Sequence, residues 1–274
     1  MGTLYVVATP IGNKADFTLR AIEVLKKVDL IACEDCRTSA KLLDSYDIKT
    51  PLVSYHKFNE KQRTQEIKRI LEEGKNIALI SDAGTPCVSD PGRILVEELH
   101  NSDADVKITS VPGASAITAL LSVVPRRGEE FAFLGFLPRV KNQQEQLFRK
   151  YINFNTVFYE SANRLIASLQ NLADARGENT KIAIGRELTK MYEEIKTGSV
   201  KELIEYFNTH TLKGEIAGMI YAQEEDSEND AEIAEKIYTL KKLGFSAKDI
   251  SSILSALFNV NKNQVYKLAI TDKN

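Results

Sequence analysis

Short apolar, β-branched runs alternate with helix-period segments through the first half of this 274-residue chain. Four runs have the length and composition of buried strands, bounded by Gly, Pro, Asn or Asp: 4–8, 30–33, 77–81 and 106–111. Three segments between them repeat apolar residues at helical spacing: 18–28, 62–71 and 93–99. This alternation predicts an α/β fold with a largely parallel sheet that helices cover on both faces.

A second α/β domain is predicted after the first, and a helical tail after that. The second domain has strand patterns at 156–159, 181–185 and 215–221, and helical patterns at 165–172 and 200–207. We divide the chain into an N-terminal α/β domain (1–122), a second α/β domain (123–223), an acidic linker (224–230) and a C-terminal helical module (231–274).

The C-terminal module shows three helical patterns, at 231–243, 247–258 and 262–270. Ser246 and Asp249 have the spacing to cap the second of them. The module is either a helix-turn-helix-like unit or a plain packing element, and the sequence does not decide between these.

Charge and cysteine content limit the classes of protein. The 36 Lys and Arg nearly balance the 38 Asp and Glu, so any nucleic-acid surface must be local. Three cysteines are too few for a disulfide framework and fit a reducing compartment. No apolar run reaches the roughly 18 residues of a membrane helix, and the N-terminus lacks a basic signal-peptide region. We expect a cytoplasmic, soluble protein that has no membrane partner.

The turns that follow the predicted strands are the candidate ligand site. In parallel sheets, ligands bind outside the carboxyl ends of the strands. Here four such turns are rich in Gly, Pro and short polar residues: 9–13, 34–38, 81–86 and 112–116. Such residues are common in any turn, so one turn alone indicates little. Four at one end of the same sheet predict a shared pocket.

Several charged residues near these turns have a structural and a functional interpretation. Glu34 and Arg37 either pair at a helix start or, with Asp35, face a ligand. Asp82 and Asp90 fit turn caps, and His56 is either a loop residue or a base. Arg126 and Arg127 are either solvated charges or, with the nearby phenylalanines, part of a nucleic-acid surface.

Other active-site motifs are missing from the sequence. It contains no Walker motif, no G-x-G-x-x-G after a strand and no G-x-S-x-G elbow, which disfavours kinases, P-loop hydrolases, nicotinamide dehydrogenases and serine hydrolases. Cys33 and Cys36 have the spacing of a redox motif or half a zinc site, but the motif stands alone and two small side chains at a strand end explain it better. The third cysteine, Cys87, has no Cys or His close by in sequence, so we expect no metal.

Read together, the turn motifs identify a family. The order V-A-T-P-I-G-N, E-D-x-R-T, S-D-A-G-T-P-x-V-S-D-P-G, V-P-G-x-S-A, G-F-L-P-R, Y-E-S and R-E-L-T-K resembles the bacterial ribosomal RNA cytidine 2′-O-methyltransferases of the tetrapyrrole-methylase superfamily. The resemblance runs from Thr3 to about Tyr221. It implies two α/β domains, S-adenosylmethionine in the cleft between them, a homodimer, and 16S RNA of the small ribosomal subunit, not DNA, as the partner.

The resemblance also assigns cofactor-binding residues by position. They are Pro10, Ile11, Gly12, Asp82, Gly84, Thr85, Val88, Ser115, Ala116, Tyr159, Glu160, Glu215 and Ile216. The superfamily's G-D-P turn reads Gly84-Thr85-Pro86 here, so Asp82 is expected to replace that acid. Two positions depart from the subfamily: Cys36 replaces a threonine and Asn163 a histidine.

A 2′-hydroxyl is a poor nucleophile when neutral, so its methylation is expected to need a base that removes the proton. We expect Glu34, Asp35 or His56 to be that base, and Arg37, Arg126, Arg127 and Arg139 to contact RNA. The alternatives are a tetrapyrrole or protein side-chain methylase of the same superfamily, or a ribosome-binding factor without catalysis.

Overall fold

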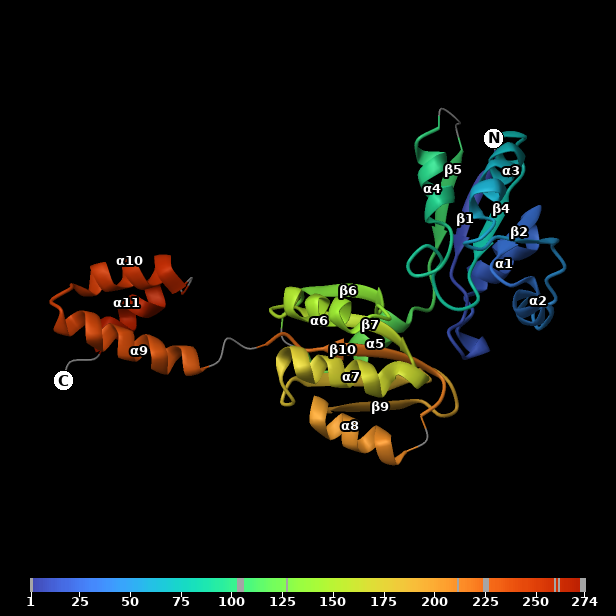
Figure 1. Ribbon diagram of the computed structural model, residues 1–274. Helices are drawn as coiled ribbons and strands as arrows, with labels where there is room; N and C mark the ends of the chain where they lie inside the picture. Colours follow the sequence, from blue (N-terminus) through green and yellow to red (C-terminus); the bar gives the residue numbers. More distant parts are fainter. Residues whose placement is uncertain are drawn as a thin grey trace. The chain divides into compact units, whose positions relative to one another are not determined.

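The computed structural model describes residues 2–102, 106–126, 128–210, 212–223, 227–258, 260 and 262–271, without side chains at 227–232, 264 and 271. These residues form two compact units, 1–222 and 223–274. The first contains both sheets and the second contains only helices (Figure 1). Each unit is described by itself.

The N-terminal sheet has five parallel strands in the order β3-β2-β4-β1-β5. They are β1 (Thr3–Val7), β2 (Leu30–Cys33), β3 (Leu52–Ser54), β4 (Ile77–Ile80) and β5 (Lys107–Val111). The predicted parallel sheet is therefore confirmed. The strand β3 was not predicted, because three residues are too short to show a pattern.

Helices cover both faces of this sheet, since all its connections are crossovers. The helices are α1 (Leu19–Lys27), α2 (Cys36–Asp44), α3 (Glu60–Glu72) and α4 (Arg93–His100), with a short 3-10 turn, η1 (Lys14–Asp16), before α1. Leu25 and Leu43 of α1 and α2 pack on one face with Ile31. Ile67 and Leu95 of α3 and α4 pack on the other face.

The second sheet is mixed, in the order β6-β7-β10-β8-β9. Its strands are β6 (Phe131–Phe136), β7 (Asn155–Ser161), β8 (Lys181–Arg186), β9 (Glu194–Ser199) and β10 (Glu215–Ile220). Only β6 and β7 run parallel, and the other pairs are antiparallel. One face is covered by α6 (Lys141–Lys150), α7 (Ala162–Arg176) and α8 (Val200–Thr209), through a core that includes Phe148, Leu169 and Leu203.

Helix α5 (Ala116–Val123) packs on the opposite face of the second sheet. Its Ile117 and Leu120 join Met219 of β10 in one buried cluster, which also contains Ile11 from the loop after β1. The boundary that we place at 122/123 assigns α5 to the N-terminal domain, whereas its packing is with the second sheet. This cluster brings the loop after β1 against the second sheet.

The C-terminal unit consists of α9 (Ser227–Lys242), α10 (Ala247–Phe258) and α11 (Lys262–Thr271) around a core that includes Ile237, Ile250 and Val265. Part of the predicted linker is wrong, because α9 begins at Ser227; residues 224–226 lie outside the described part. The predicted cap is confirmed: the Asp249 N–H donates to Ser246 Oγ at 3.2 Å, and the Ser246 N–H donates to Asp249 Oδ2 at 3.3 Å.

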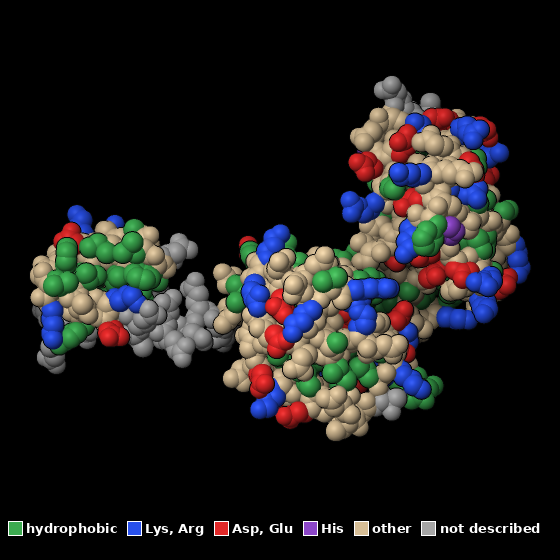
Figure 2. All heavy atoms as spheres, viewed as in Figure 1, with side chains coloured by type: hydrophobic (Ala, Val, Ile, Leu, Met, Phe, Trp, Pro, Cys, Tyr) green, Lys and Arg blue, Asp and Glu red, His purple; other side chains and the backbone are tan. Residues whose placement is uncertain are grey.

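Figure 2 shows hydrophobic side chains on the visible face of this unit. None of the helices in the described ranges is long and apolar enough to cross a membrane.

Candidate active site

The turns after β1 and β4 are joined by backbone hydrogen bonds. The Thr9 N–H donates to the Gly84 carbonyl at 2.9 Å, and the Gly84 N–H donates to the Thr9 carbonyl at 3.1 Å. Gly84 has φ +80°, and a Cβ there would lie 3.3 Å from Ile11 Cγ2. A side chain would therefore bring both backbone strain and crowding, which explains glycine at this point of the turn.

A cavity of about 330 Å³ lies at this end of the N-terminal sheet. Its walls come from the turns after β1, β4 and β5 and from strands and loops of the second sheet. Eleven of the thirteen predicted cofactor residues line it: Ile11, Asp82, Gly84, Thr85, Val88, Ser115, Ala116, Tyr159, Glu160, Glu215 and Ile216. The tertiary structure thus brings together residues that are up to 205 positions apart in sequence, from 11 to 216.

Pro10 and Gly12 do not line the cavity. An added Cβ on Gly12 would lie 2.4 Å from Lys190 Cγ, so this glycine allows the two loops to approach each other. Glu160 lines the cavity, but its carboxylate is already engaged: it pairs with Arg164 at 3.1 Å and accepts from Ser168 Oγ at 2.8 Å. Its carboxylate therefore supports the fold, and only the rest of the residue is available to a ligand.

Carboxylates gather at the cavity. Asp82, Asp90 and Glu215 line it, and Glu34 lies close enough to raise the pKa of Asp90. Partial burial, followed by the Glu34 and Asp82 charges, raises the pKa of Asp90 to about 6. Burial also raises the pKa of Asp82 and of Glu34, and for Glu34 the Asp82 charge adds to the effect. The site therefore favours a positively charged ligand and holds a carboxyl group that titrates near neutral pH.

From the sequence alone, Asp90 is interpreted as a turn cap and is not selected as a site residue. The signal was present in S-D-P-G, where a second acid follows Asp82 by eight residues. Its importance depends on burial and on neighbours from other strands, which the motif does not show.

The three predicted bases lie beside one another at the carboxyl ends of β2 and β3. The Asp35 carboxylate caps α2, accepting from the Arg37 N–H at 2.8 Å, and this hydrogen bond lowers the Asp35 pKa. Burial and the Asp82 charge raise the pKa of Glu34, and the charge of His56 offsets part of this effect, which places Glu34 and His56 near each other. Asp35 connects the group to the cavity, because its N–H donates to Asp82 Oδ1 at 3.2 Å.

An ion-pair network engages Glu215, one of the residues that line the cavity. Lys190 Nζ donates to Glu187 Oε1 at 2.8 Å and to Glu215 Oε2 at 2.9 Å. The same loop reaches the N-terminal sheet, where the Asn13 N–H donates to Thr189 Oγ1 at 3.1 Å. The loop that follows β8 thus connects the two halves of the site.

Aromatic side chains lie inside the cavity and beside it. Tyr159 contacts Phe133 and Phe136 edge to face, with ring centroids 5.1 and 5.5 Å apart. Outside, Phe58 is 86% exposed, and Lys57 Nζ lies 5.0 Å from its ring centroid. Arg37 is also exposed, on the first turn of α2.

Two basic side chains of the predicted basic region at 126–150 are engaged within the protein. Arg126 donates to the backbone carbonyls of Gly128 and Glu129, at 2.9 and 3.0 Å, and so closes its own turn. Arg127 lies outside the described residues. Lys141 pairs with Asp174 at 2.7 Å. Arg139 is exposed.

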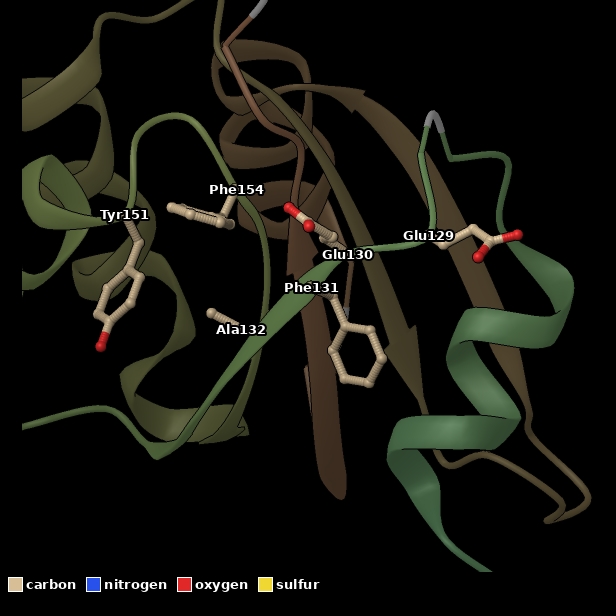
Figure 3. Close-up of a pocket in the computed structure, with 6 residues that line it drawn as sticks. All are labelled: Glu129, Glu130, Phe131, Ala132, Tyr151 and Phe154. Atoms are coloured by element: carbon tan, nitrogen blue, oxygen red, sulfur yellow. The ribbon is translucent and has the colours of Figure 1, made fainter.

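A second hollow, of about 500 Å³, lies at the start of β6. Figure 3 shows its lining residues: Glu129, Glu130, Phe131, Ala132, Tyr151 and Phe154. All of them come from β6, the turn before it and the segment between α6 and β7. This hollow contains none of the predicted cofactor-binding or catalytic residues, and strand ends do not converge on it. The cavity beside Gly84 is therefore the candidate active site.

Known proteins resemble this chain over most of its length. Residues 3–204 match the tetrapyrrole (corrin/porphyrin) methylases. The ribosomal RNA small subunit methyltransferase I of Synechocystis sp. is 37% identical over 275 residues, 98% of each chain. The protein of the same name from Thermotoga maritima is 43% identical over 225 residues, which cover 82% of this chain and 100% of that one.

Among solved structures, the methyltransferase CobJ has a TM-score of 0.62 at 18% identity, covering 81% of this chain and 95% of that one. This likeness shows the fold. The family match and the sequence relatives together confirm the resemblance seen in the turn motifs: the chain belongs to the tetrapyrrole methylases and, among them, to the ribosomal RNA small subunit methyltransferase I family.

Proposed function

We propose that this protein transfers a methyl group from S-adenosylmethionine to the 2′-hydroxyl of a cytidine in the 16S RNA of the small ribosomal subunit. The observation that carries the proposal is the acidic cavity between strand ends of the two sheets, lined by Asp82 and Asp90, whereas the third lining acid, Glu215, is paired with Lys190. Membership of the family, whose relatives carry the name ribosomal RNA small subunit methyltransferase I, supports the choice of substrate.

The cavity fits S-adenosylmethionine in size and chemistry. Its volume of about 330 Å³ is within the range of small-molecule sites. Ile11, Val88 and Leu188 offer apolar contacts, and the carboxylates suit a ligand with cationic groups. The side-chain-free backbone at Gly84 allows close approach. When bound, S-adenosylmethionine supplies an electrophilic methyl group.

Asp90 is the base that we propose. A general base works best when its pKa lies near the operating pH, and the pKa of Asp90 is raised to about 6. An Asp90 Oδ atom would accept the proton of the 2′-hydroxyl as the oxygen is methylated. Glu34 and Asp82 contribute by keeping the pKa of Asp90 high. Asp35 is less suitable, because its carboxylate caps α2 and its pKa is lowered.

The RNA surface that we propose begins at the carboxyl ends of β2 and β3. Phe58 and Lys57 offer an exposed ring beside a cation, and Arg37 adds a second charge. Single-stranded bases stack on such aromatic faces, while cations bind the phosphates. Arg139 could extend the contact, whereas the Arg126 guanidinium is engaged with its own turn.

The direct test is methyl transfer to RNA. Purified protein is incubated with methyl-labelled S-adenosylmethionine and small subunits from a strain that lacks the homologous enzyme. Nuclease digestion and mass spectrometry then locate the label. We expect it on the ribose of one cytidine. A label on a base, on protein or on an added corrinoid precursor would replace this proposal with another methylase activity.

A test variant and a matched control variant separate an effect on chemistry from an effect on folding. Asp90→Asn keeps the side-chain shape and is expected to lose turnover while retaining S-adenosylmethionine binding. Asp44→Asn changes an exposed carboxylate on the last turn of α2 and is expected to behave as wild type. Cofactor binding without any transfer by the wild-type protein would favour a non-catalytic ribosome-binding factor.

The assembly and location of the enzyme follow from the same proposal. We propose that it acts as a homodimer in the cytoplasm, where small subunits are assembled. A dimer would also double the area available to RNA. Sedimentation equilibrium is expected to give twice the 30.6 kDa chain mass, and a single-chain mass would refute the dimer.

A further inference from the structure

Cys33 and Cys36 are side by side at the rim of the candidate active site. Cys33 is the last residue of β2 and is fully buried, and Cys36 is the first residue of α2 and is partly exposed. Their Sγ atoms lie 3.3 Å apart. A disulfide bond is about 2.05 Å long, so closing it requires a movement of about 1.3 Å.

The two residues between the cysteines connect this pair to the cavity. The Asp35 N–H donates to Asp82 Oδ1 at 3.2 Å, and Asp82 lines the cavity. Glu34 lies near Asp90, whose pKa it raises. Glu34 and Asp35 form the chain between the two cysteines, so a backbone adjustment that closes the bond would change this turn.

We propose that Cys33 and Cys36 form a reversible redox pair that a hydroperoxide oxidises to a disulfide, and that this disulfide pulls the Asp35 N–H away from Asp82. Disulfides in reducing compartments are mostly transient and sense oxidants. A sensing cysteine is exposed to the oxidant and has a second cysteine next to it. Cys36 and Cys33 have these two positions.

The oxidation proceeds in two balanced steps. The Cys36 sulfur attacks the hydroperoxide, its O–O bond breaks, and Cys36 sulfenic acid and water (from hydrogen peroxide) are formed. The Cys33 sulfur then attacks the Cys36 sulfur, forming the S–S bond and breaking the S–O bond. The leaving hydroxide takes the Cys33 thiol proton as water. Burial raises the pKa of Cys33 to about 12, which assigns the first step to Cys36.

Peptide mapping tests the disulfide independently of any enzymatic activity. Trypsin releases residues 28–37 as one peptide that contains both cysteines. After hydrogen peroxide treatment and alkylation, we expect this peptide to have lost the mass of two hydrogens and to carry no alkyl label. Cys87 is expected to stay alkylated. A doubly labelled peptide, or one with sulfinic acid at Cys36, would overturn the proposal.

Hydrogen exchange and activity test the consequence for the turn. In the oxidised protein the Asp35 amide is expected to exchange at least tenfold faster, and methylation to fall at least tenfold, with dithiothreitol reversing both. Cys36→Ser should abolish both effects and Cys87→Ser should abolish neither. Unchanged Asp35 exchange in the oxidised protein would overturn the link to the cavity. Only the methylation readout rests on the proposed function. If the reduced protein shows no methylation, the proposed function fails. The peptide and exchange results still show whether Cys33 and Cys36 form a redox pair.

Discussion

The Asp90→Asn variant should make the protein more stable and less active. The raised pKa of Asp90 means that its ionised form destabilises the folded state relative to the unfolded chain. The difference between the ordinary value of 3.8 and about 6 corresponds to at most about 3 kcal/mol. Because the carboxylate is partly exposed, solvent screening reduces our expectation to about 1 kcal/mol. Asparagine keeps the shape and removes the charge, so Tm should rise by roughly 2–4 °C at pH 7.

The sign of the pH dependence follows from the direction of this shift. A folded-state pKa above the unfolded value means that the native protein binds a proton more readily, so the cost is complete above about pH 6 and disappears toward pH 4. The advantage of Asp90→Asn over wild type should shrink over the same range. Thermal melts of both proteins between pH 4 and 8 measure this difference, in which the contributions of acids that do not interact with Asp90 cancel.

Activity should change in the opposite direction. Loss of a general base lowers turnover by roughly 10²–10⁴-fold, and the wild-type rate should fall tenfold per pH unit below about pH 6. Single-turnover methylation across this pH range, with cofactor binding measured in parallel, is the assay. If Asp90→Asn keeps the wild-type rate and the same decline at low pH, Asp90 is not the base.

Three other substitutions test separate parts of the structure. Gly84→Ala should lower the free energy of unfolding by about 1–2 kcal/mol in denaturant, because φ is +80°, and should also weaken cofactor binding. The control Gly74→Ala, with φ +89° and open space around it, should lose stability but not cofactor binding. Equal losses of cofactor binding in the two variants would contradict a role of Gly84 in the site. Glu160→Ala should cost about 1–3 kcal/mol in the same unfolding assay, because it removes a buried carboxylate that accepts from Ser168 Oγ and pairs with the partly exposed Arg164. A loss within about 0.5 kcal/mol, as for an exposed-surface substitution, would contradict this expectation. Phe58→Ala should leave Tm unchanged and weaken RNA binding by about 1–3 kcal/mol in a filter-binding titration, whereas unchanged affinity would exclude a stacking role.

The sequence predicted best the strands that are buried on both faces. Residues 30–33 and 77–80 are continuous apolar runs because helices cover both sides of the N-terminal sheet. The strands β3, β6 and β9 lie at sheet edges and were not predicted. Edge strands have one unpaired side and can carry polar residues, which weakens their pattern, although the edge strand β5 was predicted and β6 is apolar. The polar sequence of β9, Glu194–Ser199, is an example.

The candidate site was predicted residue by residue but not as an arrangement. The resemblance named Asp82, Gly84 and Glu215, which line the cavity, but also Pro10 and Gly12, which do not. A motif records which residue type stands at a position. Whether that side chain reaches the cavity depends on the register of loops that come from different strands.

The sequence by itself determined the fold class, the family and most of the residues at the strand ends, because these depend on local patterns and on motifs within about twelve residues. The tertiary structure decided that the pKa of Asp90 is raised to about 6, that Glu160 is paired with Arg164 and that Asp35 caps a helix. These differences arise from burial and from neighbours on other strands. Electrostatic free energy depends on distance and solvent exposure, and neither is encoded at a single position of the chain.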